Sequence, residues 1–546
     1  MQQDRSARME TLVRTAARAR ATGDFRGALA VADQAARERL AHPVLLRIQA
    51  EALIAAGKFA DAGRLLNAAL SLAPNDAPTI TDIGRLLMAE SRTEDAIQAF
   101  KAAVTIRPNL PDAWFELACA HEFAGHDDDA QTAYLKAGEL APNEAGPPAG
   151  LASIAVRQGK YDEARSHAEK ALGLCDGHPV ASLALATADR NQRNFDAARV
   201  RLEALLDRKS LNDELSRVAL GVLGDALDGV GRTTDAFAAY TRMNELILRL
   251  HAPRFGERGP VENHLHFVQR LTSWFERQDP SIWSEPMQAT GRPGPVRRHV
   301  FVLGYPRSGT TLVENILASL PDVRALEEAP TLTDADLAFL RDDESLDRLS
   351  HLDPALAEQM RAAYWTRVRA EVPDVDGKTF VDMAPLNGVK LPMIARLFPQ
   401  AIVVLCRRDP RDVVLSCFKR NFRVNASTYQ FTSLDSTARH YDAAQRLMDL
   451  HLQALPLPVH VVDYSNLVAD FDATTRALAD FVGVPWSAEM REFNRTAAER
   501  NVRTASAPQV RQGLFDGTRQ WLGYRDQMES VLPVLERWVV KFGYEI

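Results

Sequence analysis

The stretch Phe301–Leu312 combines an apolar run, a glycine-containing loop and the beginning of a helix. His299–Leu303 is predicted to form a buried strand, and the apolar periodicity of Thr311–Ser319 predicts an amphipathic helix. A helix N-terminus after such a loop offers unpaired backbone N–H groups and the positive end of the helix dipole. Both features attract anions, so this stretch is predicted to bind a phosphate-like group.

The spacing of two glycines indicates which kind of phosphate ligand this loop would bind. Gly304 and Gly309 match the phosphate loop G-x-x-x-x-G-K-[ST] of nucleotide-binding proteins, but Thr310 occupies the lysine position. That lysine contacts the β- and γ-phosphates in ATPases and kinases. Its replacement therefore argues against ATP and for a ligand with one 5′-phosphate. Arg307 supplies instead a planar cation that suits an oxyanion.

A second cluster of polar residues follows the apolar run Ala401–Cys406. Arg408 comes just after this predicted strand, at the edge where α/β sheets place their ligands, and Asp409 is positioned to cap the next helix. Ser416 and Arg420 are four residues apart and share one face of that helix. The pattern suits a dianionic phosphate, although ordinary ion pairs at the start of a surface helix would also explain it.

The string Pro306-Arg-Ser-Gly-Thr-Thr-Leu312 resembles the 5′-phosphosulfate loop of sulfotransferases that use 3′-phosphoadenosine-5′-phosphosulfate (PAPS). The resemblance covers residues 299–546 and is closest to tyrosylprotein sulfotransferases and to bacterial enzymes with tetratricopeptide repeats. It implies that PAPS is bound by these loop residues: Arg307, Ser308, Gly309, Thr310, Thr311 and Leu312. In that family an Arg, a Ser and a second Arg hold the 3′-phosphate, and their spacing is reproduced by Arg408, Ser416 and Arg420.

The same resemblance points to a general base. Leu320–Pro330 is similar to a short family strand that ends in an acidic pair, one member of which deprotonates the acceptor hydroxyl. Glu328 falls on the catalytic position, and Glu327 is the alternative. Partial burial would raise the pKa of this carboxyl into the range useful for base catalysis, whereas two adjacent carboxylates are more often solvated surface groups. We expect Arg307 to act in catalysis as well as in binding.

One position departs from the family pattern. Thr379–Asn387 is similar to a motif that reads Asp-Lys-x-Pro-Leu-Asn, but Met383 stands where the lysine is found. That lysine balances charge on the bridging oxygen, and losing a fixed cation at developing charge costs about 3 kcal/mol. Lys378 and Lys390 are candidate substitutes. Without a substitute, we expect a slow or inactive enzyme.

Further binding residues are expected near the C-terminus. Tyr464 occupies a position that contacts the nucleotide in the family, although an aromatic side chain capping the sheet edge would look the same. The segment with Ser506, Gln509 and Arg511 resembles a loop that closes over the nucleotide. Cytosolic sulfotransferases use a histidine base, but His440 lies in helical sequence away from any anion loop and is expected to be an ordinary helix residue.

The N-terminal half has an internal period of 34 residues. A turn residue recurs at this spacing, and once more after 38 residues: Gly23, Gly57, Ser91, Gly125, Gly159, Arg193 and Gly231. An alanine follows each of them by five residues: Ala28, Ala62, Ala96, Ala130, Ala164, Ala198 and Ala236. Two antiparallel helices need a small residue where they cross, so the pattern predicts seven tetratricopeptide-like repeats. Such arrays bury their apolar faces by stacking, and they offer a groove to a protein or peptide or serve as spacers or dimerisation scaffolds.

The chain is therefore predicted to combine two architectures. Residues 1–250 form an all-α helical repeat solenoid, residues 251–297 a linker with a helix at Val261–Arg277, and residues 298–546 an α/β P-loop-like sulfotransferase domain with a central parallel sheet. The strands are supplied by four apolar runs: His299–Leu303, Thr379–Met383, Ala401–Cys406 and Val459–Tyr464.

The composition and the apolar pattern argue against nucleic-acid-binding and membrane-spanning proteins. The 546 residues carry a net charge of −7, which gives no support for general nucleic-acid binding. No apolar run reaches the roughly 20 residues of a membrane span. The four cysteines have no disulfide or metal spacing, and the first residues form no apolar signal segment, so we expect a cytoplasmic protein.

The resemblance, together with these features, implies a PAPS-dependent sulfotransferase whose acceptor is a hydroxyl of a protein tyrosine, a carbohydrate or a small molecule. No metal is expected, since the leaving group carries a single 5′-phosphate. The repeats are expected to bind a protein or peptide, and a homodimer is an alternative role for them. Two other classes stay open: a phosphoryl-transfer enzyme, and an adaptor whose nucleotide-binding domain is weak or inactive.

Overall fold

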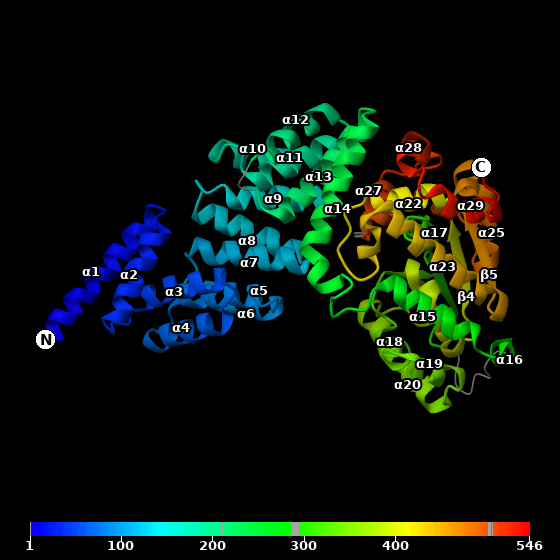
Figure 1. Ribbon diagram of the computed structural model, residues 1–546, viewed down its shortest axis with the longest axis horizontal. Helices are drawn as coiled ribbons and strands as arrows, with labels where there is room; N and C mark the ends of the chain where they lie inside the picture. The colour runs from blue at the N-terminus through cyan, green and yellow to red at the C-terminus, as the bar shows by residue number, and fades with distance from the viewer. Residues whose placement is uncertain (1, 209–210, 285–293, 501–503, 505, 546) are drawn as a thin grey trace. The chain divides into compact units, whose positions relative to one another are not determined.

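The computed structural model describes residues 2–208, 211–284, 294–500, 504 and 506–545 (Figure 1). Contacts within it divide the chain into two compact units, Met1–Arg208 and Lys209–Ile546. Over these described ranges, no helix is both long enough and apolar enough to cross a membrane.

The N-terminal unit consists of antiparallel helical pairs. Their helices are α1 (Gln2–Ala21), α2 (Phe25–Arg37), α3 (Pro43–Ala55), α4 (Phe59–Leu72), α5 (Ala77–Ala89), α6 (Thr93–Ile106), α7 (Pro111–Ala124), α8 (Asp127–Leu140), α9 (Gly146–Arg157), α10 (Tyr161–Leu174), α11 (Pro179–Asn191) and α12 (Phe195–Leu206). Every predicted turn residue between the helices of a pair has the left-handed backbone conformation, including the non-glycine residues Ser91 (φ 62°) and Arg193 (φ 65°). The predicted helical repeats are therefore confirmed for this unit.

Small residues lie where the two helices of a pair meet. Ala62, Ala96 and Ala130 are fully buried. A Cβ atom at Gly84 would lie 2.4 Å from the ring of Phe100, so only glycine leaves room for that ring. Tight packing of this kind explains why the repeat requires alanine and glycine at fixed positions.

The C-terminal unit is built on a five-stranded parallel sheet with the order β2-β3-β1-β4-β5. Its strands are β1 (Arg298–Gly304), β2 (Val323–Glu327), β3 (Thr379–Met383), β4 (Ile402–Arg407) and β5 (Val459–Asp463). The predicted parallel sheet is thereby confirmed. The chain runs from β1 to β2 and β3 on one side of β1, and then crosses to β4 and β5 on the other side. This topological switch point is where open α/β sheets bind ligands.

Helices cover both faces of the sheet (Figure 1). The helices and 3₁₀ turns of this unit are α13 (Asp213–Gly229), α14 (Thr233–Phe255), α15 (His264–Glu276), α16 (Pro280–Ser284), α17 (Thr310–Ala318), α18 (Thr333–Phe339), α19 (Asp343–Ser350), α20 (Pro354–Glu371), η1 (Pro385–Lys390), α21 (Leu391–Leu397), α22 (Pro410–Phe418), η2 (Thr428–Thr432), α23 (Leu434–Ala454), α24 (Tyr464–Ala469), α25 (Phe471–Val482), η3 (Ala488–Glu492), α26 (Phe493–Glu499), α27 (Ala507–Arg511), η4 (Gln520–Tyr524), α28 (Arg525–Met528) and α29 (Leu532–Lys541). On one face, β1 and β3 pack with α17 and α25 in one apolar core. On the other face, Phe301 contacts Tyr364 of α20 and Phe398, which follows α21.

The seventh helical pair, α13–α14, belongs to the C-terminal unit. Its turn residue Gly231 has φ 79° and its Ala236 is fully buried, as in the preceding pairs. Asn244 of α14 donates a hydrogen bond to the carbonyl oxygen of Phe418 over 3.0 Å. The ring of Phe237 lies 5.1 Å from the ring of Phe418. The pair thus follows the predicted repeat pattern but contacts the α/β fold. The C-terminal compact unit therefore begins before residue 250, where the sequence predicted the end of the repeat array.

Candidate anion-binding and active site

The loop between β1 and α17 is closely packed against the sheet. A Cβ atom at Gly304 would lie 2.5 Å from Oγ of Ser308 and 2.7 Å from the carbonyl oxygen of Cys406. The hydroxyl of Ser308 donates to the carbonyl oxygen of Tyr305 over 2.7 Å. Gly309 caps α17 in the left-handed conformation, with φ 101°. This loop, Tyr305–Gly309, is the anion loop. It places backbone N–H groups and the N-terminus of α17 at the switch point of the sheet.

A chain of buried hydrogen bonds connects this loop to α23 and α15. The hydroxyl of Tyr305 lies 2.7 Å from Nδ1 of His440, and Nε2 of His440 lies 2.8 Å from Nδ1 of His264. Burial holds the pKa of His440 well below its usual value. His440 is thus a buried residue of α23 that supports the loop, and it is outside the described lining of the pocket in front of the loop.

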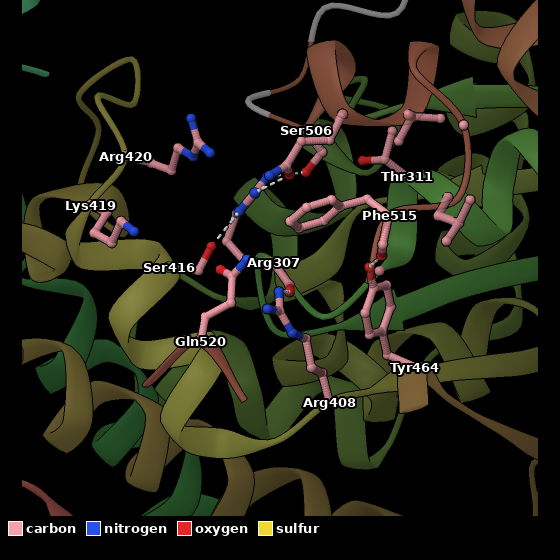
Figure 2. A pocket seen from close by; sticks show the side chains of 15 residues that line it. Arg307, Thr311, Arg408, Ser416, Lys419, Arg420, Tyr464, Ser506, Phe515 and Gln520 are labelled. Carbon is pink, nitrogen blue, oxygen red and sulfur yellow. Dashed lines mark hydrogen bonds between the residues drawn. The ribbon is translucent and has the colours of Figure 1, made fainter. Parts of the chain in front are cut away.

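That pocket brings together most of the predicted binding residues. Its lining consists of Arg307, Gly309, Thr311, Leu312, Arg408, Ser416, Lys419, Arg420, Tyr464, Ser506, Gln509, Val510, Gly513, Phe515 and Gln520. Figure 2 shows the side chain of Arg307 between Ser416 and Ser506, with Lys419 and Arg420 on one side and Arg408 on the other. Three predicted residues are outside this lining: Ser308, Thr310 and Arg511. The hydroxyl of Ser308 is directed to its own loop, Thr310 is buried at the start of α17, and Arg511 lies at the end of α27.

Hydrogen bonds hold Arg307 in the centre of the pocket. Its Nε donates to Oγ of Ser416 over 3.0 Å, and its Nη2 donates to Oε1 of Gln509 over 2.5 Å. Its Nη1 donates to Oγ of Ser506. The backbone of Arg307 has φ 72°, a conformation that is costly for a residue with a Cβ atom. The loop residue, α22 and α27 are therefore connected through one guanidinium.

The pocket has a strong excess of positive charge. Among its described lining residues, four are cationic and none is acidic. Burial and the guanidinium groups of Arg420 and Arg408 lower the pKa of Arg307 to about 9. Nε of Arg408 is buried and has no hydrogen-bond partner among the described residues. Crowded cations and an unsatisfied donor fit a ligand with more than one negative charge.

The C-terminal segment forms the opposite wall of the pocket. The hydroxyl of Tyr464 donates to the carbonyl oxygen of Phe515, and the guanidinium of Arg408 lies 5.1 Å from the centre of the Tyr464 ring. A Cβ atom at Gly309 would lie 3.1 Å from that ring, which therefore packs directly on the anion loop. The cavity volume is about 70 Å³, much smaller than the roughly 300–1,000 Å³ of typical small-molecule sites. Figure 2 shows Arg307 and Phe515 side by side in the pocket, so a ligand of that size would need these side chains to move.

The acidic pair lies at the end of β2. Glu327 is the last residue of this strand and is in register with Met383 of β3. The N–H group of Glu328 donates to the carbonyl oxygen of Met383 over 2.7 Å, and Glu328 has φ 46°. Part of the Glu328 side chain reaches solvent, yet desolvation by the surrounding protein, followed by the charge of Glu327, raises the pKa of its carboxyl to about 7. Glu328 therefore combines accessibility with the basicity that a general base needs.

A buried ion pair that was not predicted from the sequence lies beside this acidic pair. Glu314 of α17 is fully buried and pairs with Arg500 over 2.8 Å. Arg500 also donates to Oδ1 of Asn315 over 3.2 Å and to the carbonyl oxygen of Ala325 over 2.8 Å. Burial raises the pKa of Glu314 to about 7 in spite of this pairing. The pair connects α17 to β2, the strand that Glu328 follows. Its only signal in the sequence was a lone acidic residue in the apolar stretch of α17.

Met383 is part of the apolar core that joins the sheet to α17 and is fully buried. Lys378 pairs with Asp322 over 2.6 Å just before the first residue of β3, at the end of the sheet opposite to Glu328. Lys390 is the last residue of η1 and pairs with Asp336 over 2.7 Å. Of the two candidate substitutes, only Lys390 is on the carboxyl side of β3.

Acidic residues of the seventh helical pair contact the cations at the pocket rim. Asp225 of α13 lies 3.5 Å from Nη1 of Arg420, and Asp228 pairs with Nζ of Lys419. The hydroxyl of Tyr524 donates to Asp228 over 2.7 Å. Lys419 was missed in the sequence, although its place between Ser416 and Arg420 was a usable signal. Because α22 ends at Phe418, Lys419 and Arg420 follow this helix, and the expectation that Ser416 and Arg420 share one of its faces is wrong.

Comparisons with known proteins agree with this arrangement. Residues 299–488 match the model of the Sulfotransferase family, and residues 77–110, 111–144 and 155–218 match tetratricopeptide-repeat models. The resemblance found in the sequence is thus confirmed for both parts of the chain.

Relatives match at low identity. An uncharacterized protein of Aquifex aeolicus (strain VF5) is 27% identical over 345 residues, which cover 61% of this chain and 43% of that protein. Protein-tyrosine sulfotransferase A of Caenorhabditis elegans is 23% identical over 264 residues, which cover 45% of this chain and 67% of that protein. A solved structure, the APC/C hetero-tetramer Cut9–Hcn1, aligns at 17% identity with a TM-score of 0.37 over 51% of this chain and 50% of its own. The chain spans about half the length or less of the first and third of these proteins.

Proposed function

Because residues 299–488 carry a domain of the sulfotransferase family, we propose that this protein transfers a sulfuryl group from PAPS to an acceptor hydroxyl. The observation that carries the proposal is the pocket at the switch point of the sheet, where four cationic side chains converge without an acidic lining residue among those described. The unsatisfied Nε of Arg408 supports the same conclusion, because a buried donor without a partner is costly.

The two phosphate groups of PAPS would be held by different elements. The N–H groups at the start of α17, the hydroxyl of Thr311 and the Arg307 side chain would hold the 5′-phosphosulfate. Arg408, Ser416 and Arg420 would hold the 3′-phosphate, with Lys419 as a further cation. Tyr464 and Phe515 would contact the rest of the nucleotide. PAPS itself supplies an activated sulfuryl group whose departure leaves negative charge on the 5′-phosphate.

Two residues would carry the chemistry. Glu328 accepts the proton of the acceptor hydroxyl, so that the oxygen becomes nucleophilic as it attacks sulfur. Arg307 and the loop N–H groups neutralise the charge that develops on the leaving phosphate. Arg307 bonds Ser416, Ser506 and Gln509, and it would exchange some of these contacts for ligand oxygens. The Glu314–Arg500 pair connects α17, which begins at the anion loop, to β2, which Glu328 follows.

The helical repeats would supply partner or acceptor recognition. Arrays of this type commonly bind proteins or peptides, and the likeness to protein-tyrosine sulfotransferases makes a protein hydroxyl a reasonable first acceptor to test. A homodimer and a cytoplasmic location remain predictions.

The decisive experiment is calorimetric titration of the full-length protein with 3′,5′-adenosine bisphosphate, the nucleotide product of the proposed reaction. We expect tight binding without added metal, and at least a tenfold loss in Arg408→Ala, which removes a charge-assisted bidentate contact. Arg423→Ala is the matched control, because Arg423 is an exposed arginine outside the described lining. A preference for ATP with Mg²⁺, or no binding by the folded protein, would overturn the proposal.

A second candidate is a repeat-containing adaptor with an inactive nucleotide domain. It is favoured by one observation: Met383 is buried in the apolar core where the resembling enzymes have a lysine. The two candidates differ in turnover. An adaptor would bind 3′,5′-adenosine bisphosphate but transfer no sulfuryl group to any of a panel of tyrosine peptides, phenols and carbohydrates.

A further inference from the structure

Two histidines and an aspartate converge at the turn of the fourth helical pair, in the N-terminal unit. Nδ1 of His121 lies 3.4 Å from Nδ1 of His126 and 3.8 Å from Oδ2 of Asp129. The potential ligand atoms of all three residues lie within 4.8 Å of one another. His126 and Asp129 are exposed, so the group is accessible from solvent although His121 is buried.

The turn itself produces this convergence. Gly125 ends α7 in the left-handed conformation with φ 80°. The chain reverses there, and the N–H group of His126 donates to the carbonyl oxygen of His121 over 2.9 Å. Asp129 then lies in the first turn of α8. The three residues lie within the short stretch His121–Asp129, so the local backbone geometry of this turn brings their side chains together.

Neighbouring repeats show that the histidines are not required by the repeat. At the 34-residue spacing, the positions equivalent to His121 are Leu87 and Ala155, and those equivalent to His126 are Arg92 and Lys160. An apolar side chain, partly buried at Leu87 and buried at Ala155, and an exposed cation thus serve the fold at these places. In the fourth pair, imidazoles replace the apolar side chain and the cation, and their Nδ1 atoms lie 3.4 Å apart.

The separation of the two imidazole nitrogens suits a shared metal ion better than a direct hydrogen bond. Zn²⁺ binds imidazole nitrogen at about 2.0–2.1 Å in tetrahedral geometry, which places two ligand atoms about 3.3–3.4 Å apart. The two Nδ1 atoms of His121 and His126 already have this separation. As a hydrogen bond the distance would be long, since N–H donors usually lie near 2.9–3.0 Å from their acceptors.

We propose that His121, His126 and Asp129 bind a divalent transition-metal ion, Zn²⁺ being the best match, with water completing the coordination. Two imidazoles and a carboxylate form a donor set typical of zinc. The ion would join the end of α7 to the beginning of α8 and so stabilise the fourth helical pair. This site is separate from the proposed sulfuryl-transfer site and does not depend on it.

The surrounding charges favour a cation on balance. Three aspartates occupy the first turn of α8, and one of them, Asp127, is paired with Arg157 over 2.9 Å. The positive end of the α8 dipole acts against a cation, but it amounts to only about half an elementary charge. Lys101 and Glu94 also act on His121, and their opposite charges offset each other.

The test uses the untagged full-length protein after treatment with a chelator. We expect one equivalent of Zn²⁺ to bind in calorimetry, Co²⁺ to give the visible absorption of a low-symmetry site, and Zn²⁺ to raise the Tm. His126→Ala should weaken Zn²⁺ affinity at least about tenfold and abolish the Tm increase. Asp129→Asn should weaken binding less, because an amide oxygen is a poorer zinc ligand than a carboxylate.

His167→Ala serves as the control, since His167 lies on α10 and is not part of the described metal-ligand cluster. His126 and Asp129 are exposed, so both variants should fold. The inference is wrong if Zn²⁺ does not bind at millimolar concentration. It is equally wrong if the stoichiometry and affinity are unchanged in His126→Ala, because the ion would then be held elsewhere.

Discussion

The six helical pairs of the N-terminal unit and the seventh pair, α13–α14, have the same internal construction but different neighbours. A Cβ atom at Gly84 would lie 2.4 Å from the ring of Phe100, and a Cβ atom at Gly224 of α13 would lie 2.4 Å from the ring of Tyr240. The seventh pair, however, directs Asp225 and Asp228 to the cations of the proposed nucleotide pocket. A repeat pattern therefore determines how two helices pack together but leaves their outer surface free for a separate role.

The largest expected effect is a loss of activity, confined to the C-terminal unit, on removal of the proposed general base. Glu328→Gln keeps the shape of the side chain but removes its basicity, so we expect kcat/KM to fall by roughly 10²–10⁴-fold while 3′,5′-adenosine bisphosphate still binds. Because the active form is the deprotonated carboxylate, whose pKa is raised to about 7, the wild-type rate should rise with pH through 7 and then level off. A pH–rate profile with no inflection between pH 6 and 8 would contradict this assignment.

The helix crossing in each region offers a matched pair of substitutions. Ala96→Leu and Ala236→Leu both insert a larger side chain at a fully buried alanine, and each should destabilise its own unit by about 1–3 kcal/mol. Only Ala236→Leu should also weaken binding of 3′,5′-adenosine bisphosphate, because it displaces the helices that hold Lys419 and Arg420. Calorimetric unfolding and titration of both variants test this difference. Equal effects on nucleotide binding would mean that the seventh pair has no special role.

A smaller effect is expected from the carboxylates of the seventh pair. Asp228→Asn keeps an oxygen to accept the hydrogen bond of Tyr524 but removes the negative charge next to Lys419. We expect affinity for 3′,5′-adenosine bisphosphate to increase by about two- to tenfold, with the gain shrinking as salt increases. Asp95→Asn in the N-terminal unit, which disturbs an exposed pair with Arg92, should leave the affinity unchanged. Weaker binding in Asp228→Asn would show that the carboxylate serves to position Lys419.

The smallest effect concerns the turns. Ser91 holds a left-handed conformation that favours glycine, so Ser91→Gly should stabilise the N-terminal unit by about 0.5–1 kcal/mol. The reverse change, Gly231→Ser, should destabilise the C-terminal unit by a similar amount, since a Cβ atom there meets nothing within 4 Å and only the backbone is strained. Urea unfolding of both variants measures the two shifts. Shifts of the same sign would show that the two turns are not equivalent.

Local patterns in the sequence predicted the elements of both regions well. The turn residues and buried alanines were found from their spacing, and the strands from apolar runs ending at Leu303, Met383 and Cys406. Ten of the predicted binding residues line one pocket, because strand ends of a parallel sheet meet at one edge. These features depend on residues that are close in the chain, where periodicity and turn chemistry are informative.

Contacts between distant segments could not be predicted in the same way. The partners of Lys419 and Arg420 on α13, and the Glu314–Arg500 pair, depend on how whole elements pack, which no local pattern records. Phe515 was missed for the same reason: it enters the pocket from a segment without repeat or motif. The predicted boundary at residue 250 followed the repeat pattern, whereas the compact units follow the contacts of α13–α14 with the α/β fold.

The separation of contacts along the chain has a consequence for how this protein is made. Helical pairs in the N-terminal unit close over short loops, so they can form as soon as each pair has been synthesised. The pocket joins Arg307 to Gln509 across 202 residues and Lys419 to Asp228 across 191 residues. It can therefore be completed only when nearly the whole chain is available. Translation and early folding should therefore yield ordered repeats long before this pocket is complete, and a chain interrupted shortly before Ser506 would lack two of the hydrogen-bond partners of Arg307.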